Sequence, residues 1–362
     1  MPVNRPARLL TPPARPVYPM TQKANPDGSR GSRDPVVEPS KPRLLGLLGP
    51  GLVTGASDDD PSGIATYSQA GAQFAYSANR TLVLTYPLMV AVQMISAQVG
   101  RTTGRGIAGN IARRYPHWAV YSLIAPLLVA NILNIGADLG AMGDALKLLA
   151  GGNALFYVAV FGAIAIFLQM MLQYKRYVAV LKWLCLALLT YVATLLIVKI
   201  DWSAFLIGLF IPKLSADPEY LAIVVAIFGT TISPYLFFWQ ASEEAEDLKE
   251  KPREEPLVDH PEQARSARFR IEVDIIVGMG ISNFIGLSIM TTTAATLNPA
   301  GVTNIESSVD AARALEPVAG KLAELIFAVG IIGLADGHLL AVPDRKHRAA
   351  VEICLKVLDD HR

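Results

Sequence analysis

The chain is poor in charged residues, which make up 17% of its 362 residues, whereas soluble proteins carry about 25%. It has only two cysteines, Cys185 and Cys354, and two such distant thiols exclude a disulfide framework and a cysteine zinc cluster. Lysine and arginine (32) barely outnumber aspartate and glutamate (31), so no basic excess indicates a nucleic-acid partner. Hydrophobic residues, in contrast, make up 52% of the chain. This composition predicts an integral membrane protein with the lipid bilayer as its surroundings.

The few charges are clustered, and the stretches between them are long enough to cross a membrane. A helix needs about 20 apolar residues to span about 30 Å of hydrocarbon. We predict an all-α integral membrane protein with seven spanning helices and a shorter eighth run at 325–335. The seven runs are 44–57 continued by 61–79, then 81–100, 119–137, 154–173, 183–198, 221–242 and 275–293.

Basic residues in the connections predict a multi-pass cell-membrane protein with a cytoplasmic N-terminus, because cytoplasmic loops are enriched in lysine and arginine. The basic residues that fall on one side are Arg5, Arg8, Arg15, Lys23, Arg30, Arg33, Lys41, Arg43, Arg101, Arg105, Arg113, Arg114, Lys175 and Arg176. The charged connection 243–272 falls there too, and its composition is typical of a solvated linker.

The composition also divides the chain into three parts. Residues 1–42 are rich in proline, arginine, glycine and serine, which predicts a disordered cytoplasmic tail. Residues 43–343 form the predicted transmembrane domain, and residues 344–362 form a charged C-terminal tail.

The first apolar run is interrupted by Asp58, Asp59 and Asp60, which are followed by Pro61. One aspartate at the centre of a membrane helix costs about 2.5 to 3.5 kcal/mol, and proline disfavours helix at the preceding residue. We therefore predict that the helix unwinds at Asp60 and frees carbonyl oxygens beside the carboxylates. The alternative is that the aspartates lie outside the bilayer and cap a following helix. It is disfavoured because 44–57 alone is too short to span.

The sixth run carries a second interruption at Pro234. Proline lacks an amide hydrogen and removes the hydrogen bond to the carbonyl one turn earlier, near Thr230. A proline kink alone is common, but the first and sixth helices occupy corresponding places in the two halves of the chain. Interrupted helices in matching positions of two repeats indicate a transport site in the middle of the membrane.

These motifs resemble the natural resistance-associated macrophage protein (NRAMP) family of divalent-metal transporters, over about residues 43 to 333. The matching stretches are Gly49-Pro50-Gly51, Asp60-Pro61-Ser62-Gly63, 93–104, 136–140, 201–212 and 291–297. The resemblance implies a LeuT-like inverted-repeat fold with discontinuous helices 1 and 6. It also implies a transporter rather than an enzyme, with a divalent metal ion as substrate between the two breaks and no cofactor.

The resemblance places the metal at Asp60, with Asp59 as an additional carboxylate. The family's asparagine ligand falls at Gly63, its carbonyl ligand at Thr230 and its methionine ligand at Ser233. Thioethers suit softer transition metals, whereas oxygen ligands suit Mg²⁺, Ca²⁺ and Mn²⁺. We therefore expect an oxygen-only, roomier site, closest to the magnesium-carrying branch of the family, with Mg²⁺ and/or Mn²⁺ as substrate.

The positions that the resemblance assigns to proton movement also differ. The helix-3 motif Asp-Leu-Ala-Glu appears here as Asp-Leu-Gly-Ala, so Ala141 stands in place of an acid. The family's helix-6 histidine falls at Tyr235, and a tyrosine ordinarily titrates near pH ~10. Asp138 and Tyr235 are the candidate proton-pathway residues, with a structural role for Asp138 as the alternative. We expect transport that is not proton-coupled.

The resemblance ends near residue 334, where Asp336 and His338 interrupt the eighth run. Family members continue further, so we expect a truncated or frame-shifted chain whose second repeat is incomplete. One alternative is a non-transporting remnant. Another is amino-acid cargo on the same scaffold, which the aspartate cluster disfavours because bound carboxylates prefer helix N-termini and cations. A membrane enzyme lacks support, since no catalytic triad, zinc-protease or phosphate-loop motif occurs.

Overall fold

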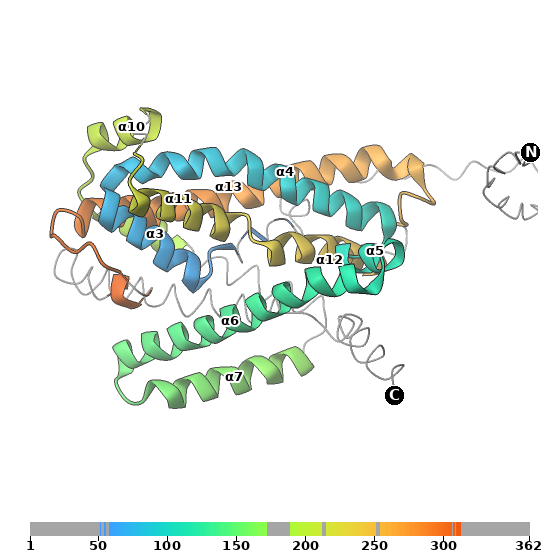
Figure 1. The fold of residues 1–362 in the computed structure, drawn as a ribbon, viewed down its shortest axis with the longest axis horizontal. Helices are drawn as coiled ribbons and strands as arrows, with labels where there is room; N and C mark the ends of the chain where they lie inside the picture. Colours follow the sequence, from blue (N-terminus) through green and yellow to red (C-terminus); the bar gives the residue numbers. More distant parts are fainter. Residues whose placement is uncertain are drawn as a thin grey trace, which may run out of the picture. The chain divides into compact units, whose positions relative to one another are not determined.

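The computed structural model describes residues 51, 54–55, 58–171, 189–211, 215–250, 254–305, 307 and 309–312. Every regular element among these residues is helical (Figure 1), so the all-α prediction is confirmed for this part of the chain. The two predicted tails, the run 325–335 and the proposed incomplete repeat all concern residues outside the described ranges, and they stay predictions.

The first predicted helix break is present. Helix α3 (Pro61–Phe74) begins directly after Asp60, whose side chain accepts a hydrogen bond from the backbone of Gly63. Asp58 is helical, whereas Asp59 and Asp60 are not. Asp60 is nevertheless only 1% exposed. It is therefore the N-cap of α3 and a buried carboxylate at once, which combines the two alternatives drawn from the sequence.

The second predicted break is also present. Helix α11 (Pro218–Thr231) ends where Ile232 leaves the helical conformation, and α12 (Pro234–Glu250) begins at the proline. Because Pro234 can occupy the first turn of a helix but cannot continue one, the chain restarts as a new helix at this point.

Most of the remaining elements fall on the predicted runs and extend several of them, whereas the short helices at 107–114 and 202–210 were not predicted. They are the 3₁₀ turn η1 (Ala75–Ala78), α4 (Asn79–Thr103), α5 (Ile107–Arg114), α6 (His117–Ala150), α7 (Ala154–Met171), α9 (Leu189–Ile197), α10 (Trp202–Phe210), η3 (Pro261–Gln263) and α13 (Ala264–Thr296). Four stretches of described helix are long and apolar enough to cross a membrane: Pro61–Thr103, His117–Ala150, Pro218–Lys249 and Pro261–Thr296.

Helix α13 packs against α3 and α4, and α12 packs against α4 (Figure 1). The last contact depends on Gly100, because a Cβ atom there would overlap the carbonyl oxygen of Ala241 on α12. Close approach through small residues is how helices associate in membranes, where lipid removes the hydrophobic driving force between them.

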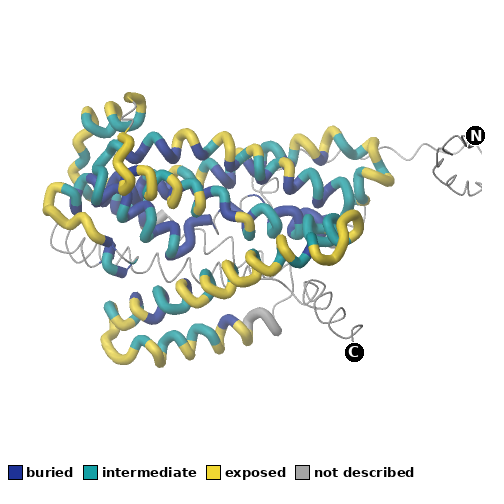
Figure 2. The backbone as a smooth tube through the Cα atoms, viewed as in Figure 1, coloured by how far each residue is buried: buried dark blue, intermediate teal, exposed yellow. Residues whose placement is uncertain are grey.

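The outer faces of α6 and α7 are largely exposed and apolar (Figure 2). On α6 they include Leu128, Val129, Ile132 and Leu133, each 48% exposed or more. Soluble proteins rarely expose contiguous apolar surface on this scale. These faces are therefore suited to contact with lipid tails.

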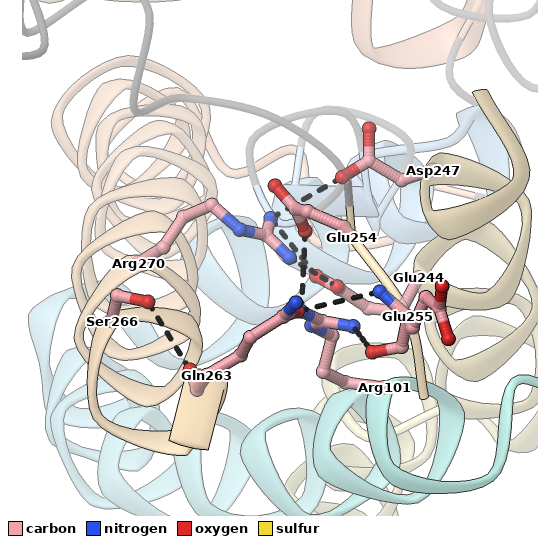
Figure 3. A network of polar contacts seen from close by, with 8 residues as sticks. All are labelled: Arg101, Glu244, Asp247, Glu254, Glu255, Gln263, Ser266 and Arg270. Atoms are coloured by element: carbon pink, nitrogen blue, oxygen red, sulfur yellow. Dashed lines mark hydrogen bonds and ion pairs between the residues drawn. The ribbon is translucent and has the colours of Figure 1, made fainter. Parts of the chain in front are cut away.

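The predicted solvated linker 243–272 is wrong in its extent. Helix α12 continues through Glu250 and α13 already begins at Ala264, so only residues between them form a connection. Some of the charges on these helix ends form ion pairs instead. Arg270 lies 2.6 Å from Glu244, which is 1% exposed, and 3.7 Å from Asp247 (Figure 3).

Arg101, at the end of α4, completes this network (Figure 3). Its guanidinium lies 3.4 Å from the carboxylate of Glu254 and donates to the carbonyl oxygen of Glu255 at 2.6 Å and to the side chain of Gln263 at 3.0 Å. The end of α4 and the connection before α13 therefore lie side by side, and their place on one side of the membrane stays a prediction. Which compartment that side faces stays a prediction.

Candidate metal-transport site

The carboxylate of Asp60 receives four hydrogen bonds at the first break. Its Oδ1 accepts from the Ser62 hydroxyl at 2.6 Å and from the Gly63 amide at 2.7 Å. Its Oδ2 accepts from the Asn134 side-chain amide at 2.7 Å and from the Tyr235 hydroxyl at 3.0 Å. These donors belong to α3, α6 and α12, so a single buried side chain joins both interrupted helices to α6.

The second break faces this carboxylate. Ser233 is 6% exposed, and its hydroxyl donates to the carbonyl oxygens of Gly229 and Thr230, both at 2.8 Å. A Cβ atom at Gly63 would lie 3.1 Å from the Thr230 hydroxyl and 3.4 Å from Asp60 Oδ1. Position 63 therefore faces Thr230 and Asp60 at close range, and a side chain there would crowd both residues.

This arrangement can offer a cation one carboxylate surrounded by neutral oxygens. Among the described residues, no three histidine, cysteine, aspartate or glutamate side chains converge to hold a metal ion. A site with few charged ligands suits an ion that keeps part of its water shell, as Mg²⁺ does when it binds through one or two carboxylates.

The two preceding aspartates are completely buried. Asp58 Oδ2 accepts a hydrogen bond from Ser282 on α13 at 2.9 Å. Neither carboxylate oxygen of Asp59 has a hydrogen-bond partner among the described residues. A buried carboxylate without donors is costly, so Asp59 is a reasonable second anchor for a cation, although it shares no hydrogen bond with the Asp60 group. Its predicted role as a ligand stays a prediction.

Asp138 lies on α6, is 0% exposed and follows Asn134 by one helical turn. Residues four apart lie on the same face of a helix, so Asp138 is on the side of α6 that reaches Asp60. Ala141, which replaces the family's acid, packs against the apolar core. Tyr235 reaches Asp60 directly. The structure thus brings the candidate proton-pathway positions to the site, and their role in proton movement stays a prediction.

Asn134 was missed in the sequence. It stands within the apolar run 119–137, where an amide is unusual, and its spacing of four from Asp138 is typical of one polar helix face. That spacing was the available signal. What it could not indicate was a partner 74 positions away in the chain.

Two interrupted helices that meet at a buried carboxylate in an apolar helical domain define a transporter-type membrane fold. A crystal structure of the Eremococcus coleocola manganese transporter, bound to an aromatic bis-isothiourea substituted compound, has this fold. It superposes with a TM-score of 0.68 at 17% identity over 83% of this chain, which spans 63% of that protein's length.

Residues 51–335 match the family described as natural resistance-associated macrophage protein-like. The divalent metal cation transporter MntH of Pectobacterium carotovorum subsp. carotovorum (strain PC1) is 30% identical over 298 residues, which cover 80% of this chain and 68% of that protein. MntH of Yersinia pestis (strain Pestoides F) is 31% identical with the same coverage. The chain belongs to the NRAMP-like family, whose members named here are metal cation transporters and not enzymes.

Proposed function

We propose that this chain carries divalent metal ions across the cell membrane, with Mg²⁺ and/or Mn²⁺ as substrate. The observation that carries the proposal is the position of Asp60, a buried carboxylate at the point where the breaks of α3 and α11–α12 face each other. Unwound backbone at membrane depth is tolerated where it lines a cavity, and half-helix ends there coordinate ions in transporters of this architecture. The relatives are named for divalent metal cations and manganese.

The choice among metals rests on ligand softness. The Thr230 hydroxyl lies next to Gly63, the Ser233 hydroxyl bonds to the Thr230 carbonyl oxygen, and no thioether stands at the break. Hard oxygen ligands favour Mg²⁺ and Mn²⁺, whereas a soft sulfur ligand would favour ions such as Cd²⁺. We place the chain nearest to the magnesium-carrying branch of the family on this ground.

We also propose that transport is not coupled to protons, with the N-terminus in the cytoplasm. A proton relay in a membrane uses chains of aspartate, glutamate and histidine. Ala141 cannot carry a proton, and the Tyr235 hydroxyl is a hydrogen-bond donor to Asp60. Proteoliposomes with a pH dye inside will test this, since metal entry without acidification is the expected result.

The metal assignment is tested by calorimetric titration of the purified chain with Mn²⁺ and Mg²⁺. We expect Asp60→Ala to abolish binding. Asp201→Ala is the matched control, because Asp201 caps α10 with the same kinds of bonds, from the Ser203 hydroxyl at 2.6 Å and the Ala204 amide at 3.0 Å. The Ser203 hydroxyl holds the pKa of Asp201 below its usual value, so the control also removes a charged carboxylate.

Metal uptake into proteoliposomes containing a Mn²⁺- or Mg²⁺-sensitive dye extends the same comparison to transport. Saturable uptake by the wild type and by Asp201→Ala, but not by Asp60→Ala, supports the proposal. Equal metal affinity in Asp60→Ala and the wild type would overturn it.

A further inference from the structure

All four acceptor positions on the Asp60 carboxylate are filled by hydrogen-bond donors. A cation can coordinate this carboxylate directly only if at least one donor gives way. The Ser62 and Gly63 bonds are local to the start of α3, because both donors lie within three residues of Asp60. The donors that can give way without unwinding the helix start therefore act on Oδ2.

Asn134 differs from the other donors in what it can offer after giving way. A side-chain amide carries an NH₂ donor and a carbonyl acceptor on one carbon, and rotation about the Cβ–Cγ bond exchanges them. The Asn134 NH₂ group lies 2.7 Å from Asp60 Oδ2. After rotation, the amide oxygen occupies the same place beside the carboxylate. The residue is half-buried and not fully enclosed.

The geometry points to Asn134 as a metal ligand. Its amide donates to Asp60 when no cation is bound and turns its carbonyl oxygen to the cation when one binds. The inference rests on the proposed function and deepens it, since it adds a ligand from α6 to a site built from the two broken helices. The Tyr235 hydroxyl, 3.0 Å from the same carboxylate oxygen, can accompany this change by turning its hydrogen away.

This assignment is consistent with the lack of a side chain at Gly63, which leaves position 63 unable to supply a side-chain ligand. From α3, only the Ser62 side chain bonds to the Asp60 carboxylate, because Gly63 has no side chain and donates through its backbone amide. An amide arriving from α6 supplies a neutral oxygen from the other side. The resulting ligand set holds no sulfur, as the proposed preference for hard ions requires.

Asn134→Leu and Asn134→Met separate a ligand from a mere hydrogen-bond donor. Both remove the NH₂ group, but only methionine brings an electron-pair donor, a soft thioether, to the same place. Binding of Mg²⁺, Mn²⁺ and Cd²⁺ to the full chain is measured by calorimetry. Asn131→Leu is the matched control, since it makes the same change one turn earlier on α6.

We expect Asn134→Leu to weaken Mg²⁺ and Mn²⁺ binding by at least about tenfold, the lower end of what loss of a group near a metal costs. Asn134→Met should bind Cd²⁺ more tightly than Asn134→Leu does, while Mg²⁺ binding stays weak in both. Equal affinities of the two variants for all three ions would overturn the assignment, as would wild-type affinity in Asn134→Leu. If Asp60→Ala loses binding while the Asn134 variants keep it, only this inference fails. If Asp60→Ala keeps binding, the proposed function fails as well.

Discussion

The backbone amide of Gly51 donates to the carboxylate of Asp274 at 2.7 Å, across 223 positions of sequence. Asp274 lies on α13 and is 0% exposed. Gly51 is helical and belongs to the Gly-Pro-Gly motif that opens the first membrane run. A charged acceptor strengthens a hydrogen bond, so Asp274 ties the helical residue Gly51 to α13.

This contact predicts a specific loss of stability. Asp274→Ala leaves a buried amide without its acceptor and should cost about 1 to 3 kcal/mol. Asp274→Asn keeps a side-chain oxygen and should cost less. The unfolding temperature of the detergent-solubilised chain will report the difference. Glu272→Ala, two positions earlier on α13, is the control, and equal effects of Asp274→Ala and Glu272→Ala would contradict the role of the contact.

The residue at position 233 should set the preference of the site between Cd²⁺ and Mg²⁺. Ser233→Met places a thioether at the second break and should raise the affinity for Cd²⁺ relative to Mg²⁺ by about tenfold, or ~1.4 kcal/mol. Competition titrations with the two ions measure the ratio. Ser122→Met provides a control at an exposed serine whose hydroxyl also bonds to a carbonyl three residues earlier. Wild-type protein that already prefers Cd²⁺ strongly would show that the site does not select by oxygen ligands.

The contacts of Arg101 at the end of α4 should contribute measurably to the stability of the fold. Breaking a fully buried ion pair costs ~3 to 5 kcal/mol, and the cost here should be nearer ~1 to 3 kcal/mol because Glu254 is 32% exposed and keeps contact with water. Arg101→Ala should lower the unfolding temperature accordingly, and Arg101→Lys should restore only part of it, since lysine lacks the guanidinium fork. Arg114→Ala, at an exposed position, should change little. A loss as large in Arg114→Ala would mean that net charge, not the network, is responsible.

The α4–α12 contact should tolerate no side chain at position 100. Gly100→Ala places a methyl group against the carbonyl oxygen of Ala241, and backbone must shift to admit it. Overpacking of this kind costs about 1 to 3 kcal/mol or more. Gly109→Ala is the control, because the nearest atom there is 3.9 Å from the new Cβ. The yield of folded protein after solubilisation will separate the two, and equal yields would refute the close approach.

Both helix breaks were predictable because their causes are local. Pro61 and Pro234 lack an amide hydrogen wherever the chain goes, and the penalty for aspartates in lipid does not depend on which helix packs beside them. The predicted linker 243–272 failed for the opposite reason. Charged residues are typical of solvated loops, and only the folded chain brings Arg270 within 2.6 Å of Glu244.

By itself, the sequence determined that this chain is helical, belongs in a membrane and breaks its helices at Asp60 and before Pro234. These outcomes follow from hydrogen-bonding capacity and hydrophobicity, which each residue carries with it. The tertiary structure alone decided which groups meet at the Asp60 carboxylate. Asn134 and Tyr235 reach it from 74 and 175 positions away, and such pairings arise only when packing of whole helices sets the distance between side chains.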